Sequence, residues 1–138
     1  MASTTTQNSQ KFHTSNPYEK QFGYSRAVRR GPFIFVSGTT SIDGTTGVLL
    51  HPESAYEQER QIFAEIVGAV EAVGGTREDV VRVRMFVTAD EDSGDVGRAL
   101  KESFGAVGPA ATMILGAKFV DAQMKVEIEA DAVMLTLW

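Results

Sequence analysis

Two stretches decide the fold of this chain: GPAATMI at residues 108–114 and KVEIEA at residues 125–130. The glycine and proline at the start of the first stretch end a helix and lead into a strand over residues 111–117. In the second stretch apolar residues alternate with acidic ones, and this period of two predicts a last strand over residues 124–135. The chain is therefore expected to finish with two neighbouring strands.

Two helices are expected before these strands. Residues 54–57 (SAYE) have the spacing of a capping box, and apolar residues then recur at helical spacing as far as Val73. Gly74-Gly75 ends this helix. A second helix is predicted over Ser93–Phe104, where the apolar residues again share one face.

Three further strands complete the pattern. Tyr24–Val28 and Phe33–Ser37 flank the turn at residues 29–32, and Val80–Thr88 alternates between apolar and polar residues. In Val80–Thr88 one face is expected to hold Val81, Val83, Met85 and Val87, and the other Arg82, Arg84 and Phe86. The order ββ-α-β-α-ββ predicts an α/β (α+β) single domain with a mixed sheet and two long helices on one face. The other sheet face then requires a second copy of the chain to cover it.

Composition excludes several classes of function. The net charge of −5 and pI near 5.0 argue against nucleic-acid binding, which needs clustered lysine and arginine. With no cysteine and two histidines, neither a metal site nor a cofactor is expected, and a Ser-His-Asp triad would rest on His51 because His13 lies in a polar tail. Residues 1–16 are expected to form a flexible extension and residues 17–138 the domain. No segment is apolar enough to cross a membrane, so a cytoplasmic protein is expected.

The chain resembles the Rid (reactive intermediate deaminase, or YjgF) family over residues 24–133. The resemblance is carried, in order, by GYSRAV at 23–28, FVSG at 35–38, TG at 46–47, GG at 74–75, DVV at 79–81, PA at 109–110 and VEIEA at 126–130. Each piece is short, and their order and spacing make the match specific. It implies a chorismate-mutase-like fold and a homotrimer with clefts between subunits. Family enzymes hydrolyse enamines and imines to carbonyl compounds and ammonia.

The resemblance also implies a set of site residues. Glu127 falls on the glutamate that positions water, Tyr24 on the family tyrosine, and Ser37-Gly38 on the serine–glycine turn. At Ala111, before Thr112, the family's deaminases carry an arginine that binds the substrate carboxylate. Gly97 and Thr39 also depart from the usual asparagine and glutamine. The chain thus resembles the Rid subgroups that lack the arginine.

Each of these residues also has an ordinary structural interpretation. Glu127 is either an acid–base group or a solvated strand residue, and Tyr24 either binds substrate or packs at a strand end. Ser37 has no histidine nearby in sequence, so we expect it to line the site rather than act as a nucleophile. Arg26 and Arg84 are candidates for the missing cation, although surface or inter-subunit salt bridges are the simpler interpretation.

The sequence therefore predicts a small-molecule enzyme acting on an imine, enamine or similarly activated compound without an α-carboxylate, by hydrolysis or a tailoring step. Glu127 and Tyr24 are the expected catalytic residues. Ser37, Gly38, Ala111, Thr112, Arg26, Arg84 and Phe86 are the expected substrate-binding residues. The alternative is a non-catalytic trimer that binds a metabolite or a partner protein.

Overall fold

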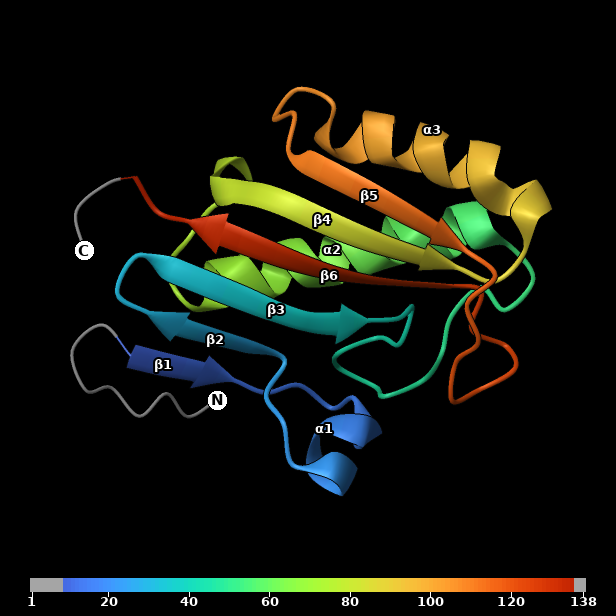
Figure 1. Ribbon diagram of the computed structural model, residues 1–138. Coiled ribbons are helices and arrows are strands. Elements are labelled where there is room, and N and C mark those ends of the chain that lie inside the picture. Colours follow the sequence, from blue (N-terminus) through green and yellow to red (C-terminus); the bar gives the residue numbers. More distant parts are fainter. Residues whose placement is uncertain (1–8, 136–138) are drawn as a thin grey trace.

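A six-stranded mixed sheet forms one layer of the computed structural model, and two long helices cover one of its faces (Figure 1). The structure describes residues 9–135. In chain order, the strands and helices are β1 (Ser9–Phe12), α1 (Pro17–Phe22), β2 (Ala27–Arg30), β3 (Phe33–Thr39), α2 (Ala55–Ala72), β4 (Val80–Val87), α3 (Ser93–Phe104), β5 (Ala110–Leu115) and β6 (Val126–Val133). The expected fold class is confirmed.

The strand order across the sheet is β1-β2-β3-β6-β4-β5. β4 and β5 are parallel, since α3 carries the chain back between them, and every other neighbouring pair is antiparallel. The last strand, β6, is thus inserted between β3 and β4, and its acidic residues lie in the middle of the sheet (Figure 1).

The core lies between the sheet and α2, with α3 packed alongside. Ile62, Phe63 and Ile66 of α2 are almost fully buried, and the Phe63 ring meets Phe104 of α3 edge to face with 5.0 Å between ring centroids. Ser54 caps α2 by accepting a hydrogen bond from the Glu57 N–H. Both helices that the apolar spacing predicts are confirmed.

The opposite sheet face is not covered by any part of residues 9–135. Phe33 and Phe35 of β3 are 49% and 50% exposed, and Ile114 of β5 is 48% exposed. Arg84 of β4 lies among them and pairs with Glu129 and Asp131 at 3.2 Å each. Three large apolar side chains on one open face form a surface that favours contact with another protein surface.

The prediction of a flexible extension over residues 1–16 is wrong for residues 9–16. Ser9–Phe12 forms β1, the edge strand paired with β2, and Asn16 caps the short helix α1 by accepting a hydrogen bond from the Tyr18 N–H at 3.0 Å. Polar composition concealed these elements because an edge strand and a one-turn helix bury few side chains. Residues 1–8 lie outside the described part of the chain.

Two strand predictions also need correction. The first predicted strand, Tyr24–Val28, begins three residues later at Ala27, because α1 and its glycine cap occupy the preceding residues. In β4, Val81 is 45% exposed rather than buried with Val83 and Met85. The pairing register shifts between Val80 and Arg82, which turns Val81 away from the core. No helix in the described residues is long and apolar enough to span a membrane.

Candidate functional site

Glu127 lies on β6 opposite Phe86 of β4, and its half-buried side chain lines two adjoining hollows. The hollows have volumes of about 320 and 400 Å³. Both are lined by Gly38, Lys118, Phe119 and Glu127, so the carboxyl group stands where they meet. The sequence predicted this glutamate as the centre of a site, and the structure places it in the walls of both cavities.

Gly38 forms the floor beneath this carboxyl group. A Cβ atom at this position would overlap the Glu127 carboxyl group, so any larger residue would have to displace that carboxyl group from its place over the backbone. The approach depends on an irregularity in β3, whose pairing with β6 shifts register between Val36 and Thr39. The Ser37-Gly38 turn expected from the sequence thus places the Gly38 backbone, rather than a side chain, against the Glu127 carboxyl group.

The environment raises the pKa of Glu127 above the ordinary value of a glutamate. Desolvation is the largest cause, the Arg26 guanidinium opposes it, and the neighbouring Glu129 carboxylate adds to it. A carboxyl group with a raised pKa retains its proton closer to neutral pH, so it can donate a proton as well as accept one. This is the electrostatic property that acid–base catalysis requires.

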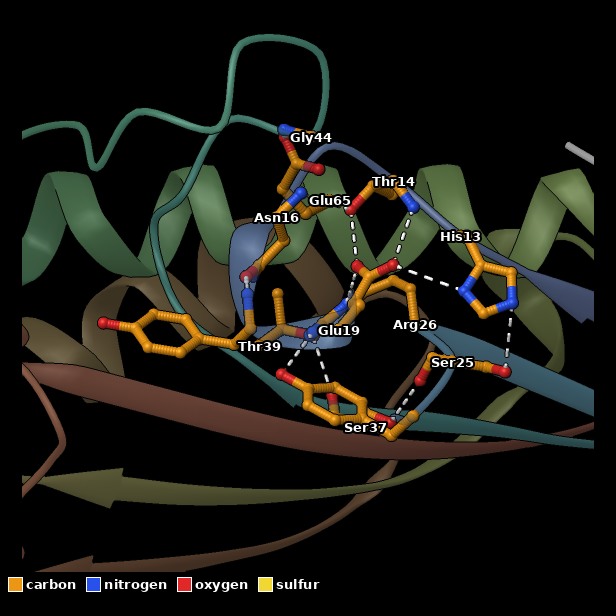
Figure 2. Close-up of polar contacts among 12 residues, drawn as sticks. His13, Thr14, Asn16, Glu19, Ser25, Arg26, Ser37, Thr39, Gly44 and Glu65 are labelled. Atoms are coloured by element: carbon orange, nitrogen blue, oxygen red, sulfur yellow. Dashed lines mark hydrogen bonds and ion pairs between the residues drawn. The ribbon is translucent and has the colours of Figure 1, made fainter. Parts of the chain in front are cut away.

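Arg26 is buried and does not line the hollow. Figure 2 shows its guanidinium among the polar groups that it contacts. Its Nε atom pairs with Glu19 at 3.0 Å, and one terminal nitrogen donates to the Gly38 carbonyl at 2.8 Å and the Thr39 hydroxyl at 3.0 Å. Its other terminal nitrogen donates to the Tyr24 hydroxyl at 3.1 Å. All three guanidinium nitrogens therefore bond to protein groups, and two of these groups belong to Gly38 and Tyr24, which line the hollow.

Tyr24 lines the smaller hollow together with Glu127. Its hydroxyl oxygen accepts from Arg26, so its own proton remains available to donate toward a ligand. Tyr24 and Arg26 both precede β2, and only Tyr24 lines the hollow.

The other expected binding residues lie in different places. Phe86 lines the larger hollow. Ser37 donates its hydroxyl to the Ser25 carbonyl at 2.7 Å and lines neither hollow, so it stabilises the turn. Arg84 is taken up by its two ion pairs on the open sheet face.

Ala111 and Thr112 lie on the edge strand β5, exposed and outside both hollows. Ala111 is opposite Val83 in the register, whereas Glu127 is opposite Phe86, three residues further along β4. Within one chain, Ala111 and Thr112 therefore do not lie next to the Glu127 carboxyl group.

Several residues that shape the hollows were missed by the sequence analysis. Lys118, Phe119 and Val120 come from the loop between β5 and β6, and Tyr18 and Phe22 come from α1. Lys118 lines both hollows together with Glu127, and it has no ion-pair partner within residues 9–135. In the same range no cluster of histidine, aspartate and glutamate is suited to hold a metal ion.

A helix-backed mixed sheet whose hollows are lined by a half-buried carboxyl group defines an α/β domain with a candidate small-molecule site. The family model described as Endoribonuclease L-PSP matches residues 14–134. The chain therefore belongs to this family, the YjgF or Rid family.

Solved structures agree with this assignment. A Mycobacterium tuberculosis protein of the YjgF/YER057c/UK114 family superposes with a TM-score of 0.81 at 32% identity, over 91% of this chain and 99% of that one. The Escherichia coli YjgF gene product superposes with a TM-score of 0.78 at 28% identity, over 90% and 98%.

Sequence relatives extend the comparison. An uncharacterised Streptomyces coelicolor protein is 34% identical over 88% of this chain and 90% of its own length. A protein of Dermatophagoides farinae named 2-iminobutanoate/2-iminopropanoate deaminase is 28% identical over 80% of this chain and 85% of its own length.

Proposed function

We propose that this chain hydrolyses imines or enamines that lack an α-carboxylate, and that it belongs to the Rid proteins without the carboxylate-binding arginine. The observation that carries the proposal is the half-buried Glu127 carboxyl group with a raised pKa, lining two hollows over the Gly38 backbone. Ala111 supplies no cation, and Arg26 and Arg84 are both engaged within the protein.

The reaction needs one acid–base group and one water molecule. Protonated Glu127 donates its proton to the imine nitrogen, which makes the carbon electrophilic. Water adds to this carbon and gives a proton back to the carboxylate. The carboxyl group then protonates the nitrogen of the adduct and ammonia leaves. The hydroxyl group of the adduct returns its proton to the carboxylate as the carbonyl forms, so an imine and water yield a carbonyl compound and ammonia. Tyr24 donates its hydroxyl proton to the substrate's polar end.

The walls of the smaller hollow favour a substrate with an apolar group. Tyr18, Phe22, Phe119 and Val120 contribute aromatic and aliphatic surface to it. Phe22 and Val120 are 63% and 73% exposed, so the mouth of the hollow is itself apolar. Binding of a ligand there would remove this surface from water.

The uncovered sheet face supports a homotrimeric assembly. Phe33, Phe35 and Ile114 give that face an exposed apolar surface, which a second copy would bury. If the edge strand β5 meets a hollow of the neighbouring copy in such an assembly, the methyl group of Ala111 leaves room there for a bulkier or uncharged ligand.

The family description names a ribonuclease, and the site of this chain offers little support for RNA cleavage. Glu127 and Glu129 both line the larger hollow and would repel phosphate groups. The net charge of −5 also opposes binding of a polyanion.

Glu127→Gln is expected to lower imine hydrolysis by at least about a hundredfold, because the amide cannot exchange a proton. An amine oxidase acting on primary amines supplies imines without a carboxylate, and an amino-acid oxidase supplies 2-imino acids. The loss of imine is measured by trapping the remainder with semicarbazide. The parent protein is expected to hydrolyse the amine-derived imines faster than the 2-imino acids.

Asp131→Asn is the matched control, since Asp131 shares the strand face with Glu127 but lines neither hollow. It is expected to retain the parent rate. Equal turnover by Glu127→Gln and the parent would contradict the catalytic role. If ligands then raised the Tm of both proteins equally, a binding protein would be favoured.

Lys118→Met is expected to raise KM about tenfold for substrates with a negative charge and to leave KM for neutral imines unchanged. The ammonium group of Lys118 is the one described cation that lines both hollows, and methionine retains its apolar stem. Lys101→Met, on the exposed face of α3, is the control. An equal change in KM for charged and neutral substrates would show that Lys118 only shapes the cavity.

A further inference from the structure

A serine, a histidine and a glutamate meet in a second place, on the N-terminal side of the domain (Figure 2). The Ser25 hydroxyl oxygen lies 3.5 Å from His13 Nε2, and His13 Nδ1 lies 3.7 Å from Glu19 Oε1. His13 follows β1, Glu19 belongs to α1, and Ser25 lies between α1 and β2. The missed elements β1 and α1 therefore create this cluster.

The two contacts fit one protonation state of the imidazole. With hydrogen on Nδ1, the His13 ring directs an N–H toward Glu19 Oε1, and Nε2 is free to accept from the Ser25 hydroxyl. A serine, a base and a carboxylate that orients the base form the arrangement that activates a serine nucleophile. Both distances are longer than tight hydrogen bonds, as is common for catalytic contacts in ligand-free proteins.

The glutamate is held firmly for an orienting role. Its side chain is 3% exposed, and its Oε2 atom accepts from Arg26 Nε at 3.0 Å and from the Thr14 hydroxyl. Its Oε1 atom accepts from the Thr14 N–H at 2.8 Å and faces His13. The carboxylate is thus fixed by buried partners on one side and presents one oxygen to the histidine.

The cluster opens into its own hollow, which has a volume of about 450 Å³. Glu127 does not line this hollow, and Tyr24 is the residue that it shares with the smaller hollow of the imine site. Two cations, Lys11 and Lys20, line it together with His13 and Ser25. Two ammonium groups beside a candidate nucleophile favour a substrate that carries a negative charge.

We propose that Ser25, His13 and Glu19 form a second hydrolytic site for small anionic esters. The Ser25 oxygen attacks the ester carbon while His13 Nε2 takes the hydroxyl proton. His13 then gives this proton to the departing alcohol, which leaves an acyl group on Ser25. Water attacks the acyl carbon, His13 takes its proton and returns it to the serine oxygen. An ester and water thus yield an acid and an alcohol.

The test uses the full chain with two acetate esters, neutral 4-nitrophenyl acetate and anionic 4-acetoxy-3-nitrobenzoate, and with a fluorophosphonate probe. The parent protein is expected to hydrolyse the anionic ester with the higher kcat/KM. The probe is expected to add to Ser25, as located by peptide mass spectrometry. Ser25→Ala and His13→Asn are expected to lower kcat/KM about a hundredfold. His13→Asn is also expected to lose the covalent adduct although the serine remains.

Ser103→Ala and His51→Asn are the matched controls, since neither residue lines the hollow, and asparagine tolerates the positive φ of 56° at His51. Both are expected to keep the parent activity. Ester hydrolysis that persists in Ser25→Ala, a probe adduct on another residue, or no hydrolysis above the buffer rate would each overturn the proposal. Equal kcat/KM for the two esters would overturn the preference for an anionic substrate.

Discussion

Arg26→Met is expected to lower the free energy of unfolding by about 3–5 kcal/mol, because it leaves the buried Glu19 carboxylate without its counter-ion. The lost guanidinium also bonds to the Gly38 carbonyl, the Thr39 hydroxyl and the Tyr24 hydroxyl. A loss of this size would lower Tm by about 10–20 °C, measured by calorimetry or by circular dichroism.

The double variant Glu19→Leu/Arg26→Met separates an ion-pair effect from a packing effect. Replacing both charges with apolar groups removes the unpaired carboxylate, so the double variant is expected to be more stable than Arg26→Met alone. Arg29→Met is the matched control, because the Arg29 side chain bonds to two backbone carbonyls and to no carboxylate. Additive losses in the double variant would contradict the coupling of Glu19 and Arg26.

Arg26→Met is also expected to change the pKa of Glu127 in the candidate site. The guanidinium lowers the pKa of Glu127, so its removal is expected to raise this pKa further. Imine hydrolysis is expected to fall when Glu127 loses its proton. In the folded variant this fall is therefore expected at higher pH than in the parent.

The elements that sequence analysis predicted are those with regular burial. α2 and α3 each bury one face, and β6 alternates buried Val126, Ile128 and Ala130 with acidic residues, so their periods could be recognised. β1 and α1 carry no such period. They are held by edge pairing and by caps, which involve backbone and polar groups that occur equally in loops.

The candidate site was predictable in part for the same reason. Glu127 lies on the regular strand β6, where residue order determines position. Lys118 and Phe119 lie in a loop, where the path of the chain depends on contacts that no local pattern encodes. The burial of Arg26 was not visible either, since its partner Glu19 belongs to the missed helix.

The second large effect is expected at Glu59, a buried glutamate that must become neutral when the chain folds at neutral pH. Glu59 lies on α2 with 0% exposure, and neither carboxyl oxygen has a hydrogen-bond partner among residues 9–135. Desolvation raises its pKa from 4.5 to about 9. The carboxyl group is therefore neutral in the folded protein at pH 7 and ionised in the unfolded chain.

This difference makes stability fall as the pH rises. Between pH 4.5 and about 9 the folded state holds one proton more than the unfolded state, so the free energy of unfolding decreases by about 1.4 kcal/mol per pH unit. Below pH 4.5 both states are protonated and the penalty disappears. At pH 7 the penalty reaches about 3 kcal/mol.

Glu59→Met removes the titrating group with little change in side-chain length. The variant is expected to be more stable than the parent by about 3 kcal/mol at pH 7, and the gain is expected to grow toward pH 9. Urea unfolding of both proteins at pH 5, 7 and 8.5 measures the difference. Glu71→Met, at an exposed position of the same helix, is the control and is expected to change stability by less than about 0.5 kcal/mol at each pH.

The difference between Glu59→Met and the parent isolates this carboxyl group from the other titrating residues, Glu127 included. A gain that is constant from pH 5 to 8.5 would show that Glu59 has an ordinary pKa in the folded state and that methionine only packs better. A gain that rises with pH would show that the α2 core holds a neutral carboxylic acid. In that case the chain takes up a proton when it folds at neutral pH. Its free energy of unfolding then falls more steeply with rising pH than its surface carboxylates alone would cause.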